Sequence, residues 1–335
     1  MAHEITDTDN MFSVRANTWH GLGVILPEFP TREEAQQIAH PWEPISEPVY
    51  LSEPHIDAET NTFEERFIEA PGVQALRRSD TGALLGVMSD TYEPVNNSVM
   101  WDIAESLEQG GQNVQYETGG SLAGGKKVWL MLRLNEPLVV NGDPRGGTIP
   151  YYALQNSHDG SSAFRGQAVM TRIVCANTSK MADLDARARG TEFTFRHTKN
   201  VHDRVEEAQQ ALTQWRSSLE DWKQLCELDL MPRKITRGDV GDFLHAFIPE
   251  PAADLISDRV RGNIEAERAK WMDVFNSVTC EGITGTAYGL VQASIEYSEH
   301  VKRARTNETR FKRTYLSRND PTSRAVELAR EVASL

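Results

Sequence analysis

Residues 114–134 read VQYETGGSLAGGKKVWLMLRL, and this stretch decides the fold. Two apolar runs, Val114–Tyr116 and Lys127–Leu134, flank a glycine-rich connection. Short apolar runs bounded by glycine turns are typical of strands. The stretch therefore predicts two strands joined by a flexible loop that carries Lys126 and Lys127.

The same loop imitates a nucleotide-binding motif. Residues 120–126 fit the pattern GxxxxGK of a phosphate-binding loop. That chemistry also needs a hydroxyl after the lysine to hold magnesium, and a helix whose amino terminus meets the phosphates. Lys127 takes the hydroxyl's place and residues 128–132 continue as a strand, so the sequence argues against a nucleotide site.

Strand patterns continue on both sides of this stretch. Downstream, residues 149–154 and 168–174 are apolar, with turn residues at 145–147 and 159–162. Upstream, residues 45–88 alternate strand and turn patterns, including a hairpin of 73–78 and 83–88 around Ser79–Gly82. Residues 31–34 form a capping box that begins a short helix. Val99, Ile103 and Leu107 predict another helix, which ends at the glycines 110–111.

Beyond Cys175 the periodicity becomes helical. Apolar residues at helical spacing predict one long helix over 201–230, and further helices are expected at 237–247, 253–278, 285–304 and 321–333. Strands first and helices afterwards predict an α+β fold: an antiparallel strand-rich core, the long helix, and a helical C-terminal region. We expect a core domain over 1–230 and a helical region over 231–335. Trp215, Leu219 and Trp222 should pack against the sheet.

Composition narrows the class of protein. The 335 residues are 39% hydrophobic and 25% charged, which is typical of a globular chain. Three cysteines, far apart and without a CxxC pair, argue against a disulfide scaffold or a zinc ribbon. No signal-peptide pattern is visible, and no apolar run approaches the roughly 20 residues that span a bilayer. We expect a cytoplasmic protein without membrane contact.

Charge is distributed unevenly along the chain. The net charge of −14 argues against bulk nucleic-acid binding. Residues 1–120 hold 5 Lys+Arg against 21 Asp+Glu, and residues 201–335 hold 19 against 22. Residues 121–200 hold 11 against 6 and are the net-basic block. A basic block on an acidic body indicates a local anion-binding surface, or cations that neutralise acidic neighbours.

The basic block supplies the candidate binding residues. Long cationic side chains on strands and loops are what phosphate contacts need. Aromatic residues among them could stack on unpaired bases, although Trp129, Phe193 and Phe195 would equally suit the core. The predicted nucleic-acid-binding set is Lys126, Lys127, Trp129, Phe164, Arg165, Arg172, Arg187, Arg189, Arg196 and Lys199.

Other residues suggest an enzyme. Asn156–Gly160 contains Ser, His and Asp, but adjacent residues do not form a catalytic triad among themselves, and the composition is typical of a turn. His158, Asp159, Cys175 and His197 could form a hydrolase or nuclease-like site, although their spacing matches no known signature. We expect Trp19–Gly23 and Asn156–Gly160 mainly to set turns.

Four motifs together resemble a known family. Residues 19–23 (WHGLG), 156–160 (NSHDG), 172–178 (RIVCANT) and 196–198 (RHT) look like the phage and plasmid-like proteins grouped as domain of unknown function 932. The resemblance covers about residues 11–300 and implies a protein of a mobile genetic element. More distantly, the β-rich basic core followed by a long helix is similar to single-strand annealing recombinases of the Rad-fifty-two-like type. That likeness implies a homo-oligomer, a ring in such recombinases, that binds single-stranded DNA without ATP, metal or any other cofactor.

Three functions therefore stay open. The first is a phage or plasmid protein that anneals single-stranded DNA in recombination or replication, with no catalytic residue. The second is a metal-dependent hydrolase or nuclease. The third is an accessory protein that binds host proteins through its acidic first third. Steep salt dependence of DNA binding, metal-dependent turnover, and host-protein capture without DNA affinity distinguish the three.

Overall fold

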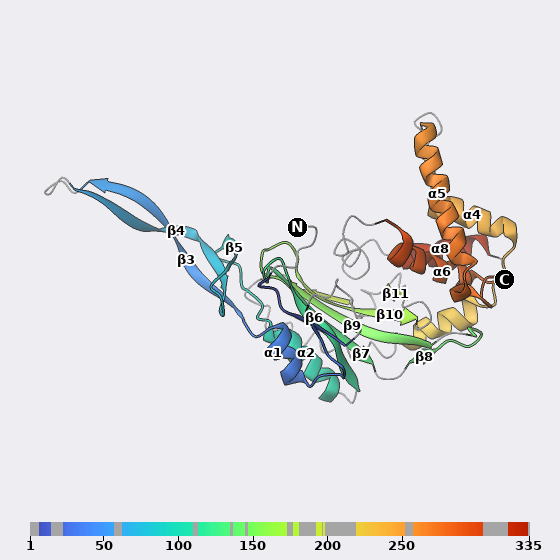
Figure 1. Ribbon diagram of the computed structural model, residues 1–335, viewed down its shortest axis with the longest axis horizontal. Helices are drawn as coiled ribbons and strands as arrows, with labels where there is room; N and C mark the ends of the chain where they lie inside the picture. Colours follow the sequence, from blue (N-terminus) through green and yellow to red (C-terminus); the bar gives the residue numbers. More distant parts are fainter. Residues whose placement is uncertain are drawn as a thin grey trace.

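The structure is a computed structural model of the chain. It describes residues 7–14, 23–56, 62–109, 113–134, 137–144, 147–172, 177–180, 192–195, 197, 219–251, 257–303 and 321–333. Strands come first along the chain and helices dominate its end, so the predicted α+β fold is confirmed (Figure 1).

A large sheet forms the centre of the molecule. Its strands run in the order β11-β10-β9-β7-β6-β1-β2, with β12 also paired to β10 and β8 to β9. Every pair in this sheet is antiparallel except β1–β2. The strands are β1 (Met11–Ser13), β2 (Val24–Ile25), β6 (Val114–Leu122), β7 (Lys127–Leu134), β8 (Leu138–Val139), β9 (Gly147–Ser157), β10 (Phe164–Arg172), β11 (Asn177–Lys180) and β12 (Glu192–Phe195).

One face of this sheet packs on two helices. In β7, the alternate residues Val128, Leu130 and Leu132 are buried in the main core. The helices α1 (Arg32–Ala39) and α2 (Ser98–Gln109) bury their apolar residues in the same core and lie against this face (Figure 1). The capping box predicted for α1 is present. α2 has the predicted extent to within two residues at each end.

A second, three-stranded sheet extends away from the body. It has the order β3-β4-β5, formed by β3 (Pro44–Ile56), β4 (Phe63–Arg78) and β5 (Leu84–Ser89). The predicted hairpin around Ser79–Gly82 is the β4–β5 connection. β3 and β4 continue beyond β5 as a two-stranded hairpin that projects far from the body (Figure 1). We call residues 44–78 the arm.

Helices occupy the end of the molecule opposite the arm (Figure 1). The predicted helix over 237–247 is confirmed at those bounds, and the expected Pro321 start of the last helix is also found. The elements are η2 (Leu225–Leu230), α4 (Arg237–Phe247), α5 (Asp258–Phe275), η4 (Val278–Cys280), α6 (Ala287–Glu296), η5 (Tyr297–Val301) and α8 (Pro321–Val332). Among the described residues, no helix combines the length and the apolar character that crossing a membrane requires.

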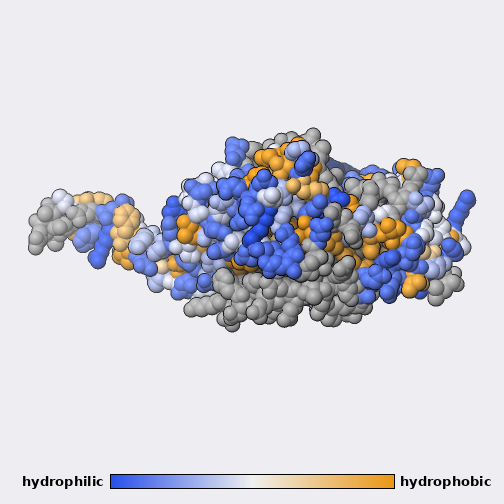
Figure 2. Space-filling view, turned by 90° about the horizontal axis from the view of Figure 1, so that it is seen from below, coloured by the Kyte–Doolittle hydropathy of each residue, from blue (hydrophilic) through white to orange (hydrophobic). Residues whose placement is uncertain are grey.

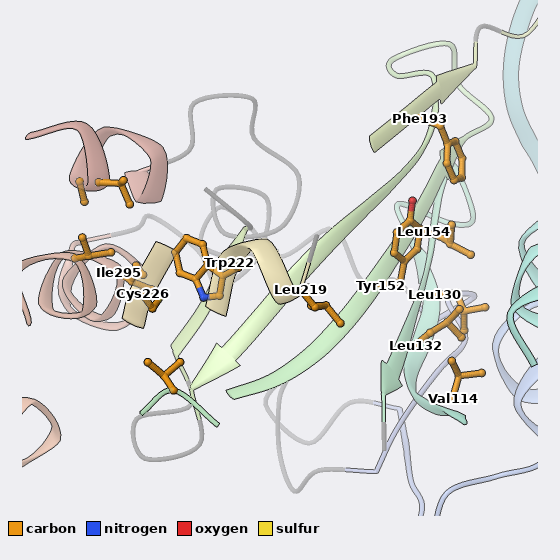
Figure 3. Packing of buried hydrophobic residues seen from close by; sticks show 14 of the residues in the cluster. Val114, Leu130, Leu132, Tyr152, Leu154, Phe193, Leu219, Trp222, Cys226 and Ile295 are labelled. Atoms are coloured by element: carbon orange, nitrogen blue, oxygen red, sulfur yellow. The ribbon is translucent and has the colours of Figure 1, made fainter. Parts of the chain in front are cut away.

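The long helix predicted over 201–230 lies partly outside the described residues. Its last part is helical from Leu219 and becomes the π-helix η2. Leu219 and Trp222 are buried in the same core as the sheet residues, as predicted, whereas Trp215 is not described. Figure 3 shows Trp222 between the strands and the helix that carries Ile295. The sheet and the C-terminal helices share one hydrophobic core. The domain boundary predicted at residue 230 stays a prediction.

Candidate nucleic-acid interface

The turn between β6 and β7 presents the two predicted lysines, and it is held in place by other segments. Ala123, Gly124 and Gly125 all have positive φ, a conformation that glycine adopts without strain. The Asp9 carboxylate accepts hydrogen bonds from the backbone N–H of Gly124 and of Gly125, each at 2.9 Å. The expected flexible loop is thus a tight turn anchored 115 residues away in the sequence.

A buried polar cluster supports this turn from below. A Cβ at Gly125 would stand 2.8 Å from Trp42 Cζ2, so only glycine fits. Arg78 lies over the Trp42 ring with its Cζ 4.4 Å from the centroid, and is only 1% exposed. Its guanidinium donates to both carboxylate oxygens of Asp80, at 2.9 and 2.7 Å. The cluster fixes the lysine-bearing turn against the base of the arm.

The Asn156–Gly160 motif forms the neighbouring turn, as predicted. The backbone N–H of His158 donates to the Lys126 carbonyl at 2.7 Å, which ties the two turns together. Asp159 accepts from the backbone N–H of Ser161 at 2.9 Å, and Gly160 has a φ of +72°. His158 Nε2 lies 2.9 Å from Asn97 Oδ1, a side-chain contact where a bond to the backbone was expected. Of the Trp19–Gly23 motif, only Gly23 is described, with a φ of +81°.

The register of strands β7, β9 and β10 places several of the predicted binding residues on one face of the large sheet. Trp129 of β7 pairs with Gln155 of β9, which pairs with Arg165 of β10. Lys127 pairs with Ser157 one row further, on the same face. Residues directly opposite each other in antiparallel strands point to the same side. Lys127 and Arg165 therefore share one end of one face, and Lys126 lies on the adjoining turn.

The two predicted stacking residues are buried, which corrects the expectation that they would meet bases. Phe164 is 0% exposed and faces the main core, where its ring stacks on Phe193 and on Phe195 at 5.8 Å between centroids. Trp129 is 4% exposed and packs with Met11 and Leu122. The alternative that Trp129, Phe193 and Phe195 are core residues describes this structure.

The other predicted residues are only partly visible. Of Arg172, the structure describes the backbone alone, at the end of β10 opposite Thr148 and Asn177. Arg187, Arg189, Arg196 and Lys199 lie outside the described residues, as does Cys175 of the enzyme alternative. Of the predicted cations, Lys126, Lys127 and Arg165 have described side chains, and all three are half-buried.

With this geometry in place, comparison with known proteins is informative. The family model "Domain of unknown function (DUF932)" matches residues 84–320. The chain belongs to this family. The DUF932 match begins at β5 and includes the strands β6 to β12 of the large sheet and most of the helices. The strands β1 to β4 and the helix α1 precede it, and α8 follows it. Neither the curated proteins nor the solved structures gave a match.

Three buried histidines, His40, His158 and His197, have lowered pKa values. Burial is the main cause that lowers the pKa of His158, to about 3, and nearby His197 and His40 lower it further. Burial also lowers the pKa of His40 to about 4 and reduces the pKa of His197. In the described part of the DUF932 protein, no group of three or more His, Cys, Asp or Glu residues is placed to hold a metal.

The two lysines were predicted from the sequence, but the residues that hold their turn in place were not. Asp9, Trp42 and Arg78 carry no local motif and lie far from residue 125 in the sequence. Arg78 and Asp80 in one hairpin were the only available signal, since an arginine two residues before an aspartate can form a pair. Their burial depends on segments that only the fold brings together.

Proposed function

We propose that this DUF932 protein binds single-stranded DNA through its phosphates and assists annealing during recombination or replication, without nucleotide or metal. The observation that supports the proposal is that Lys127 and Arg165 share one end of one sheet face and that Lys126 lies on the adjoining turn. They come from two strands and a turn that the Asp9 and Arg78 contacts hold in place. Cations on a rigid scaffold bind phosphates without the entropy cost of ordering a loop.

The buried aromatic residues sharpen the mode of binding. Trp129 and Phe164 are covered, so they offer no platform for stacking bases. Contacts would then be made to the sugar-phosphate backbone, and the bases would stay available for pairing with a complementary strand. Phosphate contacts carry no sequence information, which suits a protein that anneals any two complementary strands. Arg172, Arg187, Arg189, Arg196 and Lys199 extend the proposed phosphate-binding set on the basis of the sequence.

Salt dependence of binding tests the proposal. Each phosphate contact contributes about −0.7 to the slope of log affinity against log salt for single strands. We expect Lys126→Ala/Lys127→Ala to flatten the slope of oligo-dT binding by about 1.4, and Arg165→Ala by about 0.7. Gel shifts over a salt series, without nucleotide and with a chelator, give these slopes. Melting temperatures check that each variant is folded.

A matched double variant controls for net charge. Arg259→Ala/Arg261→Ala removes two exposed cations from α5, at the other end of the molecule (Figure 1). We expect its slope to equal that of the wild type. The proposal fails if folded wild-type protein shows no single-strand binding at low salt. It also fails if the α5 variant loses as much slope as the lysine variant.

A further inference from the structure

One side of the projecting hairpin gathers its aromatic residues. Residues 50–56 of β3 pair with residues 63–69 of β4, and we call this part of the hairpin the outer arm. Paired residues point to the same side, and successive residues of a strand alternate between the two sides. We call one side the aromatic arm face, and it consists of Tyr50, Ser52, Pro54 and Ile56 on β3 and Phe63, Glu65, Phe67 and Glu69 on β4.

The aromatic arm face is open to solvent. Phe63 is 72% exposed, Phe67 64%, Ile56 62% and Tyr50 56%. Figure 2 shows hydrophobic residues at the surface of the projecting arm, next to hydrophilic ones. Because an aromatic side chain carries about 150–250 Å² of surface, the three rings expose on the order of 400 Å² together. Apolar patches of this size on a single chain often mark a binding surface.

The charge of the outer arm restricts what can cover this face. Residues 50–69 contain six carboxylates against one cation, Arg66. Two of the carboxylates, Glu65 and Glu69, alternate with Phe63 and Phe67 on the aromatic arm face itself. Carboxylates at this density repel the phosphates of DNA and of anionic lipid headgroups. The complementary surface is apolar and carries lysine or arginine beside its apolar residues.

The edges of the outer arm are poorly suited to pairing with an added strand. Pro54 lies within β3 and has no backbone hydrogen to donate, and β4 carries charged residues at positions 64, 65, 66 and 69. Natural sheets use prolines and charges on edge strands to prevent edge-to-edge pairing. A partner of the outer arm is therefore expected on the aromatic arm face, where only side chains make contact.

An α-helix is the element that fits such a contact. It satisfies its own backbone hydrogen bonds, so it needs no free strand edge on its partner. Seven residues of strand extend for about 23 Å, which is the length of a helix of about 15 residues. An apolar stripe on such a helix would cover the rings, and cations along its flank would meet Glu65 and Glu69.

We propose that the aromatic arm face binds a basic amphipathic helix of another protein. The outer arm lies outside residues 84–320, which the DUF932 model matches, and its charge is opposite to that of the proposed DNA-binding cations. The arm is therefore a second interaction surface, separate from the one that would bind phosphates. The inference does not depend on DNA binding, because it concerns a contact between proteins.

Two synthetic peptides test the partner's chemistry. Each is a 15-residue amphipathic helix with leucine on one side, and the other side carries lysine in the first peptide and glutamate in the second. We expect the wild type to bind the leucine/lysine peptide in fluorescence anisotropy titrations. The leucine/glutamate peptide should not bind, because its carboxylates meet those of the arm.

Variants of the two sides of the outer arm locate the contact. Phe63→Ser/Phe67→Ser should weaken binding of the leucine/lysine peptide by about tenfold or more, because two exposed rings no longer become buried. The matched control is Leu51→Ser/Ile68→Ser, which removes apolar groups from the opposite side of the same hairpin. We expect this control to bind as the wild type does. Melting temperatures check that both variants are folded.

Charge variants test the role of the glutamates. Glu65→Gln/Glu69→Gln should weaken binding of the leucine/lysine peptide by about threefold at low salt, and the difference should shrink as salt screens the charges. Glu265→Gln/Asp273→Asn removes two exposed carboxylates from α5, at the other end of the molecule (Figure 1). Because this control has the same net charge, its binding should equal that of the wild type.

Each other outcome overturns the proposal. A wild type that does not bind the leucine/lysine peptide, or that binds both peptides equally, shows that the arm does not select a basic helix. Peptide binding by Phe63→Ser/Phe67→Ser at wild-type strength places the contact elsewhere on the acidic chain. Flotation of the wild type with phosphatidylcholine vesicles assigns the face to a lipid surface if the same substitutions abolish it. Sedimentation as a dimer that these substitutions dissociate assigns the face to a second copy. Oligo-dT binding by the same variants shows separately whether the proposed function stands.

Discussion

The large sheet and the arm are both antiparallel β-structure, but they place their apolar side chains in opposite environments. Leu130 in the centre of β7 is fully buried, whereas Phe63 at the start of β4 is mostly exposed. Arg77 and Arg78 show the same difference within one strand. Arg77 pairs with Glu47 near solvent, and Arg78 is buried against the Trp42 ring and bound to Asp80. At the base of the arm, the two faces of β4 thus lie in different environments.

Because of this difference, the apolar side chains of the body and those of the arm contribute differently to the free energy of folding. Apolar side chains in the body contribute to the free energy of folding, because each is removed from water when the chain folds. Those on the outer arm remain largely exposed after folding and therefore gain much less from it, and a two-stranded hairpin alone is marginally stable in water. Substitutions in the two regions should therefore have distinct effects.

The largest expected difference is between Leu130→Ala and Phe63→Ala. Leu130→Ala leaves a cavity in the main core and should lower the free energy of unfolding by about 2–5 kcal/mol. Phe63→Ala should change it by less than about 0.5 kcal/mol in dilute protein, because the side chain is exposed there. Urea unfolding followed by circular dichroism measures both. Equal losses in the two variants would show that the arm is covered by its own chain.

A smaller difference is expected between two glycines with positive φ. Among the described residues, no atom lies within 4 Å of the position that a Cβ at Gly72 in the arm would occupy, whereas a Cβ at Gly125 would meet Trp42 and Arg78. Gly72→Ala should cost about 1–2 kcal/mol, the strain of a left-handed alanine. Gly125→Ala should cost up to about 3 kcal/mol, because crowding adds to that strain. It should also weaken DNA binding by shifting Lys126. Urea unfolding and gel shifts measure the two effects, and equal unfolding losses would contradict the packing of the turn on Trp42.

The body could be predicted from sequence to a large extent. The β6–β7 pair follows from apolar runs around a glycine turn, and the bounds of α1 and α4 follow from caps that are local in sequence. Local rules succeed here because the residues that determine each element lie within it. The π-helices η2 and η5 were not predicted, since they share their hydrogen-bonding residues with the α-helices that they extend.

The site and the arm were harder for two physical reasons. Trp129 and Phe164 lie within two residues of a cation in the sequence, but both faces of the large sheet are covered at these positions. Alternation then gives no sign of which face meets solvent. For the arm, the pattern of residues 45–88 indicated strands without showing that they project. The projection of β3 and β4 from the body is visible only in the fold (Figure 1), because no local sequence pattern encodes the direction in which a hairpin leaves a domain.

The smallest expected effect distinguishes the buried histidines of the body from the exposed histidine of the arm. Because burial lowers the pKa of His158 to about 3, the unfolded chain binds a proton at this site when the folded chain does not. Stability from His158 is therefore complete above its unfolded pKa of about 6.5 and is lost as the pH falls toward 3. Between pH 7 and pH 5.5 this loss is about 1 kcal/mol, and His40 adds a similar loss, since its pKa is lowered to about 4.

His158→Gln should remove its share of the pH dependence even where the variant is less stable at pH 7. His55→Gln on the arm, where the side chain is exposed, should retain the pH dependence of the wild type. Urea unfolding at the two pH values measures these differences, and an unchanged pH dependence in His158→Gln would show that this imidazole is accessible to protons in the folded chain.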